Sequence, residues 1–363
     1  MHINYVNKFL FSGFLFLGGL LTAQEVEHHI VVPHNDSKAA VQKEIDEDID
    51  HHIKDSHSFT FLSDSETGKH YGFPLPVILW DDGLHVFSSS KFHHGETVAE
   101  SNGNYYKLYH SKIYRTDAEG TINYDEGHHA SNVKPIDFSI TKNVLMMFVT
   151  GLLMFLLFAG LAKSFKKGPI ATGAGRFFEP IVLYIRDDIA RPNIGPKYKK
   201  FMPYLLTVFF FIWFLNLFGL TPLGVNVTGN IAVTFALAII TFIITQFSGN
   251  KNYWKHIFWM PGVPVPMKFI LAPIELLGVF IKPFALMIRL YANIMAGHVV
   301  LMSIIALVFI VQNWIGGGLS LVLAFFLSII ELLVAALQAY IFTLLSALYF
   351  GFAVEEHDHE EAH

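Results

Sequence analysis

Five residues that could hold or move ions stand within one long apolar stretch: Glu275, Lys282, Arg289, Asn293 and His298. The first three are spaced seven residues apart, and seven residues of a helix fall about 20° short of two full turns. These three side chains therefore form one stripe along a helix. Asn293, four residues after Arg289, stays near that stripe, whereas His298, nine residues after Arg289, falls on the opposite side.

A second apolar stretch carries Glu331 and Gln338, which are again seven residues apart and so share one helix face. An arginine near the centre of a bilayer costs at least about 3 kcal/mol, so such residues indicate function more than packing. The alternative is that Lys282 and Arg289 reach toward the membrane surface, or pair with Glu275 and Glu331 to join helices. Lys282 suits that role better, because it lies nearer to one end. Ionisable stripes on two neighbouring helices indicate an ion path.

The elements that must position these residues are membrane-spanning helices, each of which needs about 20 mostly apolar residues. The fourth apolar stretch would extend about 65 Å as a helix, twice the thickness of the hydrocarbon core. It must tilt strongly, lie partly in the membrane plane, or break, and Pro273 and Pro283 are able to bend it. We therefore expect an all-α polytopic membrane protein that ends in a long tilted helical hairpin. Its membrane domain covers residues 138–363, with spans at about 144–162, 202–220, 231–247, 269–311 and 319–354.

Composition supports this class of protein. Hydrophobic residues make up 53% of the 363 residues and charged residues 15%, against roughly 25% charged in ordinary globular proteins. The absence of cysteine excludes disulfides, cysteine-ligated zinc, iron–sulfur clusters and thiol catalysis. The net charge of −5 is unevenly divided, because residues 24–135 are acidic and residues 136–363 are basic. The two halves therefore face different surroundings, and nothing indicates binding to nucleic acid.

Two signals predict how the chain lies across the membrane. Lys8 precedes a short apolar run that ends in small residues at Ala23, which predicts a cleavable signal peptide over residues 1–23. The alternative is an uncleaved anchor, because Leu21 fits the cleavage pattern poorly. Lys and Arg concentrate between the first and second spans and between the third and fourth, which predicts that these loops are cytoplasmic. Both signals place residues 24–137 in the periplasm and the carboxyl terminus in the cytoplasm.

The outer segment, residues 24–137, is acidic and rich in histidine. Its first part, up to about residue 55, lacks a convincing apolar face and is expected to be a helix or a flexible arm. Alternating apolar residues follow, and the turn residues Asp81-Asp82-Gly83 between two such runs predict a hairpin. We expect a small β-rich domain with strands near residues 57–62, 77–80, 84–87, 104–109 and 112–114.

Thirteen of the 19 histidines lie in this outer segment. Neutral imidazole is a common metal ligand, but no histidine pair is followed by a second pair at the spacing of a tetrahedral site. We therefore interpret these histidines as a solvated, weakly buffering surface and predict no metal site.

The run from Arg289 to His298, Arg-Leu-Tyr-Ala-Asn-Ile-Met-Ala-Gly-His, resembles the signature of subunit a of the F-type ATP synthase. The resemblance continues at residues 274–276, 282–283 and 337–342, and more weakly at 216–222 and 228–234. Together these matches cover roughly residues 170–356. The histidine-rich outer domain lies beyond this common core and is similar to the extended amino termini of this subunit in some bacteria.

The resemblance implies a proton-translocating stator subunit in the bacterial inner membrane, with no cofactor and no catalytic centre of its own. Its implied partners are the ring of c subunits, subunit b of the peripheral stalk and, indirectly, the catalytic head. Arg289 matches the essential cation that faces the carboxylate of the ring and separates two half-channels. The positions that match residues lining or shaping those half-channels are Glu275, Asn293, His298, Glu331 and Gln338. In many bacterial relatives the two residues are exchanged, with an acidic residue at the position of His298 and a histidine at the position of Glu331.

Two other classes of function fit less well. A secondary ion transporter or channel is the main alternative, but transporters of this kind often contain internal repeats, and we find none in this sequence. An intramembrane metalloenzyme would need more than His298 as a histidine ligand in the membrane, and no His-Glu-x-x-His motif is present. Protons are the coupling ion that the resemblance favours, although selectivity lies largely in the ring.

Overall fold

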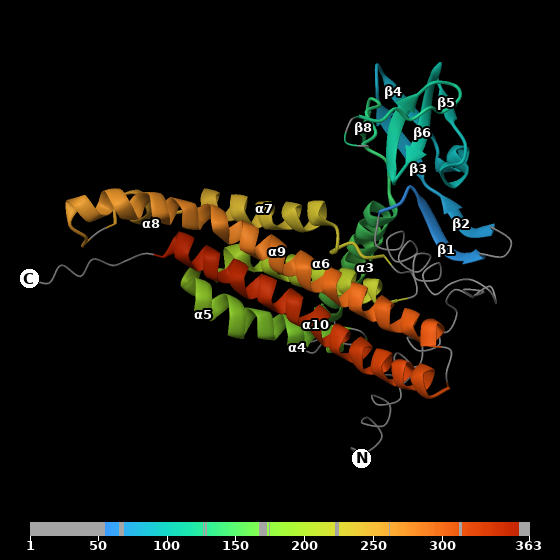
Figure 1. Ribbon diagram of the computed structural model, residues 1–363. Coiled ribbons are helices and arrows are strands. Elements are labelled where there is room, and N and C mark those ends of the chain that lie inside the picture. The colour runs from blue at the N-terminus through green and yellow to red at the C-terminus, as the bar shows by residue number, and fades with distance from the viewer. Residues whose placement is uncertain are drawn as a thin grey trace, which may run out of the picture. The chain divides into compact units, whose positions relative to one another are not determined.

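The computed structural model describes residues 55–64, 69–125, 127, 129–166, 173, 175–221, 225–260, 262–311 and 314–355 (Figure 1). The expected signal peptide and acidic arm, up to residue 54, lie outside these residues. The chain divides into two compact units. The first contains the β-strands and the start of the first long helix, and the second contains most of the remaining helices.

The β-rich part confirms the expected small domain. The predicted hairpin forms between β3 and β4, which pair in antiparallel register with Trp80 opposite Leu84. Asp82 and Gly83 in the turn have positive φ angles of 52° and 145°, which suits the short polar and glycine residues there. The strands are β1 (Ser58–Asp64), β2 (Lys69–Pro74), β3 (Pro76–Trp80), β4 (Leu84–Ser88), β5 (Ala99–Ser101), β6 (Asn104–Tyr109), β7 (Lys112–Thr116) and β8 (Ile136–Asp137).

The strands pack around one hydrophobic core. The described strands form three sheets, ordered β1-β2, β4-β3-β8 and β5-β6-β7. Buried side chains of β3, β4, β5, β6 and β7 form one core with the 3₁₀ turn η1 (Ser89–Gly95). Its buried members are Val77, Leu79, Phe87, Phe92, Ala99, Tyr106 and Ile113.

Two histidines correct the interpretation of a fully solvated histidine surface. His57 and His85 are only 4% and 3% exposed. His57 Nε2 lies 2.8 Å from Asp137 Oδ2, and the two ring nitrogens of His85 lie 3.2 Å from Ser101 Oγ and 2.8 Å from the Asp81 carbonyl oxygen. Burial alone would raise the pKa of Asp137, but its hydrogen bonds with His57 and Ser139 outweigh burial and lower it. Both imidazoles are therefore structural groups of the domain.

The outer domain is tied directly to the first long helix, α3 (Lys142–Phe165). The Lys142 amide donates to the Ser56 carbonyl oxygen at 2.9 Å, and the Asn143 amide donates to Asp55 Oδ1 at 3.2 Å. These bonds satisfy two amides that the first turn of a helix otherwise leaves without an intrahelical partner. Residues 55 and 56 thus cap a helix that begins more than 80 residues later in the chain.

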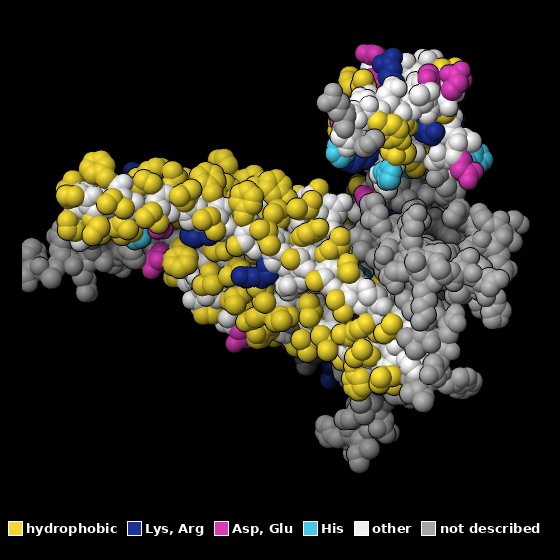
Figure 2. Space-filling model, in the orientation of Figure 1, with side chains coloured by type: hydrophobic (Ala, Val, Ile, Leu, Met, Phe, Trp, Pro, Cys, Tyr) yellow, Lys and Arg dark blue, Asp and Glu magenta, His cyan; other side chains and the backbone are white. Residues whose placement is uncertain are grey.

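The described residues from Lys142 onward are mostly helical, and five segments are long and apolar enough to cross a membrane. Figure 2 shows hydrophobic side chains over most of the visible surface of these helices, as expected for contact with lipid. The helices after α3 are α4 (Gly175–Tyr184), the π-helical turn η2 (Ile185–Ala190), α5 (Arg191–Ile194), the 3₁₀ turn η3 (Gly195–Lys197), α6 (Tyr198–Gly219), α7 (Ile231–Ser248), α8 (Lys251–Phe258), α9 (Val265–Val311) and α10 (Trp314–Val354). The predicted all-α membrane fold is confirmed.

Helix α9 settles one alternative that the sequence leaves open. It is continuous over 47 residues and passes through Pro273 and Pro283, which corresponds to about 70 Å of helix. The chain therefore does not break within this stretch.

The carboxyl end of α10 is fixed by close backbone contacts. The Asn250 amide donates to the Ala353 carbonyl oxygen at 2.9 Å, and Asn250 Nδ2 donates to the Val354 carbonyl oxygen at 3.0 Å. A methyl group added at Gly351 would overlap the carbonyl oxygen of Asn193. Because backbone cannot move aside as a flexible side chain can, only glycine fits at this contact.

We predict that Gly351→Ala destabilises the full-length protein by about 1–3 kcal/mol, because the new methyl group meets packed backbone. Gly278→Ala in α9 is the matched control, since a methyl group there has no neighbour within 4 Å. The measurement is thermal unfolding of both variants in detergent. Equal melting temperatures for the two variants would contradict the close contact.

Candidate functional site

Arg289 lies on the exposed face of α9, surrounded by apolar side chains. Its neighbour Ile288 is exposed, whereas Leu286 and Leu290 pack into the protein. Within the part of the chain that the structure describes, the guanidinium has neither an ion-pair nor a hydrogen-bond partner. Arginine stays protonated in proteins, so this face carries a permanent positive charge that the described residues leave unbalanced.

Asn293 and His298 lie on the faces of α9 that helical periodicity predicts. Asn293, one turn after Arg289, is exposed on the same side, and His298 is 9% exposed and points into the protein. In the described part of the chain, neither Arg289 nor Lys282 forms an ion pair with Glu275 or Glu331. The alternative that these cations join helices through those carboxylates therefore has no contact to support it there.

His298 and Glu331 meet between α9 and α10. Their atoms Nδ1 and Oε1 lie 3.6 Å apart, which is slightly too long for a hydrogen bond. Glu331 is 7% exposed, and neither of its carboxyl oxygens has a hydrogen-bond partner among the described residues. A short connection joins the two helices, so side chains at similar distances from it come together in an antiparallel pair. The predicted approach of these two side chains is confirmed.

The chemistry available to this pair is proton transfer. A carboxyl group can accept and release a proton, and an imidazole can bind a proton on one nitrogen and release it from the other. A small side-chain rotation or one bridging water would close the gap of 3.6 Å. The two unpartnered oxygens of Glu331 leave room for such a bond.

Gly297 makes this approach possible, and the sequence argument does not include it. A methyl group at Gly297 would lie 3.2 Å from Glu331 Oε1, which is tighter than ordinary van der Waals contact. The glycine therefore lets the Glu331 carboxyl group lie against the backbone of α9. In the sequence, the role of Gly297 is indicated by a glycine that stands directly before the histidine in a segment otherwise suited to a helix.

A buried amide adds polar groups to the face of α10 that carries Glu331 and Gln338. Asn216 of α6 donates from Nδ2 to the Ala335 carbonyl oxygen at 3.3 Å and accepts from Thr228 Oγ1 at 2.6 Å. Ala335 lies one turn after Glu331, and Gln338 is only 3% exposed. A buried asparagine in an apolar helix is the signal that could have identified Asn216.

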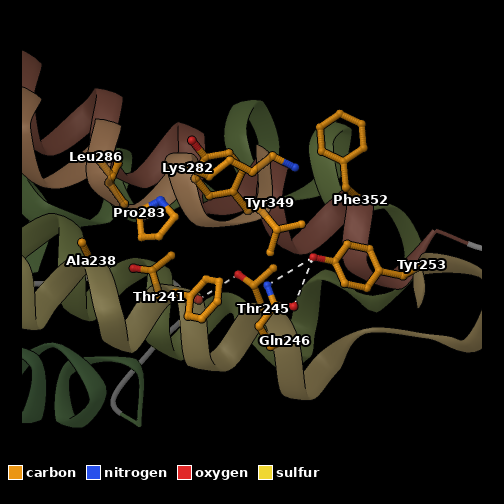
Figure 3. A pocket seen from close by; sticks show the side chains of 12 residues that line it. Ala238, Thr241, Thr245, Gln246, Tyr253, Lys282, Pro283, Leu286, Tyr349 and Phe352 are labelled. Carbon is orange, nitrogen blue, oxygen red and sulfur yellow. Dashed lines mark hydrogen bonds between the residues drawn. The ribbon is translucent and has the colours of Figure 1, made fainter. Parts of the chain in front are cut away.

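Glu275 and Lys282 lie apart from this pair. Lys282 Nζ lies 5.8 Å and 5.7 Å from the ring centres of Tyr349 and Phe352, a cation–π arrangement. It borders a cavity of about 20 Å³ (Figure 3), enough for about one water molecule. Glu275 is half-buried, and its negative charge adds to burial in raising the pKa of Tyr253.

Among the described residues, no three His, Asp or Glu side chains gather closely enough to hold a metal ion. What the arrangement offers is therefore an exposed fixed cation on one side of α9 and a buried imidazole–carboxyl pair on the other. Such an arrangement can attract an anion and can carry protons.

Comparisons with known proteins find relatives over most of the chain. A family model described as ATP synthase A chain matches residues 144–351. ATP synthase subunit a 2 of Chlorobaculum tepidum is 44% identical over 240 residues, which are 64% of this chain and 68% of that protein. ATP synthase subunit a of Chloroherpeton thalassium is 43% identical over 236 residues, 62% of this chain and 70% of that protein.

The similarity also reaches into the outer domain. A second family model, described as a domain of unknown function (DUF8433), matches residues 48–138. ATP synthase subunit a 2 of Prosthecochloris aestuarii is 39% identical over 308 residues, which are 80% of this chain and 94% of that protein.

We predict that Glu331→Gln or His298→Ala slows proton flow by about a hundredfold, the size of effect usual for the loss of a proton-transfer group. The double exchange His298→Glu with Glu331→His should recover part of the rate, because the imidazole–carboxyl pair is kept. Proton flux is measured with the complete complex reconstituted in vesicles. Thr343→Ala is the control, since the buried Thr343 hydroxyl donates within its own helix, to the Ala339 carbonyl oxygen. Normal flux in both single variants would exclude a relay.

Proposed function

This chain belongs to the ATP synthase A chain family, and we propose that Arg289 is the cation through which it couples proton flow to rotation of the c-ring. The family is the proton-translocating stator subunit of the membrane sector of the F-type ATP synthase, and it has no catalytic centre of its own. The function classes of secondary transporter and metalloenzyme are thereby set aside.

The observation that carries the proposal is the unpaired charge of Arg289 on an exposed, apolar helix face. Holding a guanidinium in the hydrocarbon region without an anion costs at least about 3 kcal/mol. An anion from another subunit must therefore face it when the complex is assembled. A ring whose subunits each carry a membrane-embedded carboxylate supplies such anions in turn.

The physical properties of arginine suit it to this position. Its guanidinium does not release a proton, so it attracts each ionised carboxylate without ever neutralising it by proton transfer. The same fixed charge repels a proton that would cross directly from one side of the membrane to the other. Protons then cross only by binding to a ring carboxylate and travelling with it.

The buried pair supplies the path to the ring from the periplasmic side. In the topology expected from the loop charges, His298 and Glu331 lie on the periplasmic side of Arg289. In this proposal they pass protons toward the ring, with Gln338 and Asn293 shaping the same path. Glu275 lies nearer the cytoplasmic end of α9 and belongs to the opposite half-channel.

The remaining contacts and the orientation complete the proposal. The chain lies in the bacterial inner membrane, with its outer domain in the periplasm and its carboxyl terminus in the cytoplasm. Subunit b of the peripheral stalk holds it against rotation and connects it to the catalytic head. The positive-inside distribution of Lys and Arg supports this orientation.

We predict that Arg289→Ala abolishes ATP synthesis and ATP-driven proton pumping in the assembled complex, because the ring carboxylate loses its fixed counter-charge. Arg289→Lys should also fail, since an ammonium lacks the planar fork and can lose its proton when desolvated. Passive proton leak should rise in the Ala variant.

The control for this prediction is Lys282→Gln, which removes a cation two turns earlier whose described contacts are aromatic rings. Pumping by reconstituted vesicles and the subunit content of the purified complex are measured together. ATP-driven pumping at the wild-type rate in the Arg289→Ala variant would exclude the proposed role.

A further inference from the structure

The turn between α8 and α9 exposes a group of aromatic rings. Trp254, Phe258, Trp259 and Phe269 are all exposed to the surroundings of the protein. Trp254 stacks on Phe258 with ring centres 6.1 Å apart, and Trp259 meets Phe269 edge to face at 6.5 Å. The rings are thus ordered against one another, although no core covers them.

Three lysines accompany these rings. Lys251 and Lys255 are exposed on α8, and Lys268 places its Nζ 4.6 Å from the centre of the Trp259 ring. Within the described residues, none of the three forms an ion pair. The sequence contains no Asp or Glu between residues 249 and 274. This segment therefore carries positive charge that no ion pair among the described residues balances.

The other side of α8 is attached to the helix bundle. Ile257 is buried, and Gln246 of α7 donates from Nε2 to the Tyr253 hydroxyl at 3.2 Å (Figure 3). The helix is thus held by one face and presents the aromatic rings and lysines on the other. Its orientation does not depend on a partner.

We propose that this surface, formed by Lys251, Trp254, Lys255, Phe258, Trp259 and Lys268, binds an anionic phospholipid of the membrane leaflet at this end of the helices. Helix α8 lies directly between the end of one candidate span, Ile231–Ser248, and the start of the next, at Val265. Aromatic rings and lysines at such positions lie at headgroup level, with rings toward the acyl chains and ammonium groups toward the phosphates.

A lipid fits these observations better than a soluble anion. A free phosphate would use the lysines and leave the exposed rings in water. A phospholipid uses both, because its phosphate meets the ammonium groups while its chains cover the rings. The orientation in Proposed function makes this the cytoplasmic leaflet, but the binding chemistry does not rest on the role of Arg289.

The test uses the complete ATP synthase complex in vesicles that contain phosphatidylglycerol or phosphatidylcholine with a photoreactive group on one acyl chain. Mass spectrometry measures how much of each lipid is cross-linked to the peptide spanning residues 251–269. We expect phosphatidylglycerol to label this peptide more than phosphatidylcholine. Replacing all three lysines by Gln should remove that preference, a loss of about fivefold per lysine and about a hundredfold in total.

The matched control replaces the same number of lysines elsewhere on the same membrane face, as Lys163→Gln, Lys166→Gln and Lys199→Gln. Lys255→Gln alone serves if the triple variant does not assemble. Equal labelling by both lipids, or an equal loss in the control, would overturn the proposal. Competition by millimolar inorganic phosphate would indicate a site for free anions and would also overturn the proposal. Labelling of the separate chain but not of the complete complex would overturn it as well, because it would indicate that a protein partner covers this surface.

This outcome is separable from the proposed coupling role. If the lysine variants lose the lipid preference yet still pump protons with ATP, the lipid surface and the Arg289 site act independently. If they keep the preference, the lipid proposal fails while the role of Arg289 is untouched.

Discussion

The structure depends on one electrostatic constraint: a guanidinium that cannot lose its proton is held on an apolar, exposed helix face, and no anion among the described residues pairs with it. Arg289 is costly in hydrocarbon by at least about 3 kcal/mol, and the described residues offer it no carboxylate. The described part of the chain therefore leaves this charge unbalanced. In the proposed function, a rotating ring of carboxylates supplies the missing anion one subunit at a time.

The proposed function adds a second requirement, that protons reach the ring without passing the arginine. Helical geometry meets it by placing His298 on the side of α9 opposite to Arg289, where it meets Glu331 at 3.6 Å. Gly297 allows this approach because a side chain there would press on the Glu331 carboxyl group. The cation and the proton-carrying pair thus belong to the same helix but are kept on different faces.

Much of this arrangement could be predicted from residue spacing, because the positions of Arg289, Asn293 and His298 around α9 follow from helical periodicity alone. The hairpin around Asp82 and Gly83 was likewise predictable from turn chemistry. The burial of His57 and His85 in the outer domain could not be predicted. Their rings bond to groups that are distant in sequence or belong to the backbone. Nor could the Asn216 bridge to α10 be predicted, since a contact between residues 119 positions apart leaves no periodic pattern.

The most direct test of the central claim is whether the Arg289 face of α9 meets the ring carboxylate. The chain contains no cysteine, so single cysteines can be introduced at Asn293, which shares the exposed face with Arg289, and at Ile294, which is buried. Each is paired with a cysteine beside the carboxylate of the ring subunit, and disulfide formation is measured in the assembled complex. The account predicts rapid cross-linking from Asn293→Cys and little from Ile294→Cys. Cross-linking from Ile294→Cys alone, or from neither position, would contradict it.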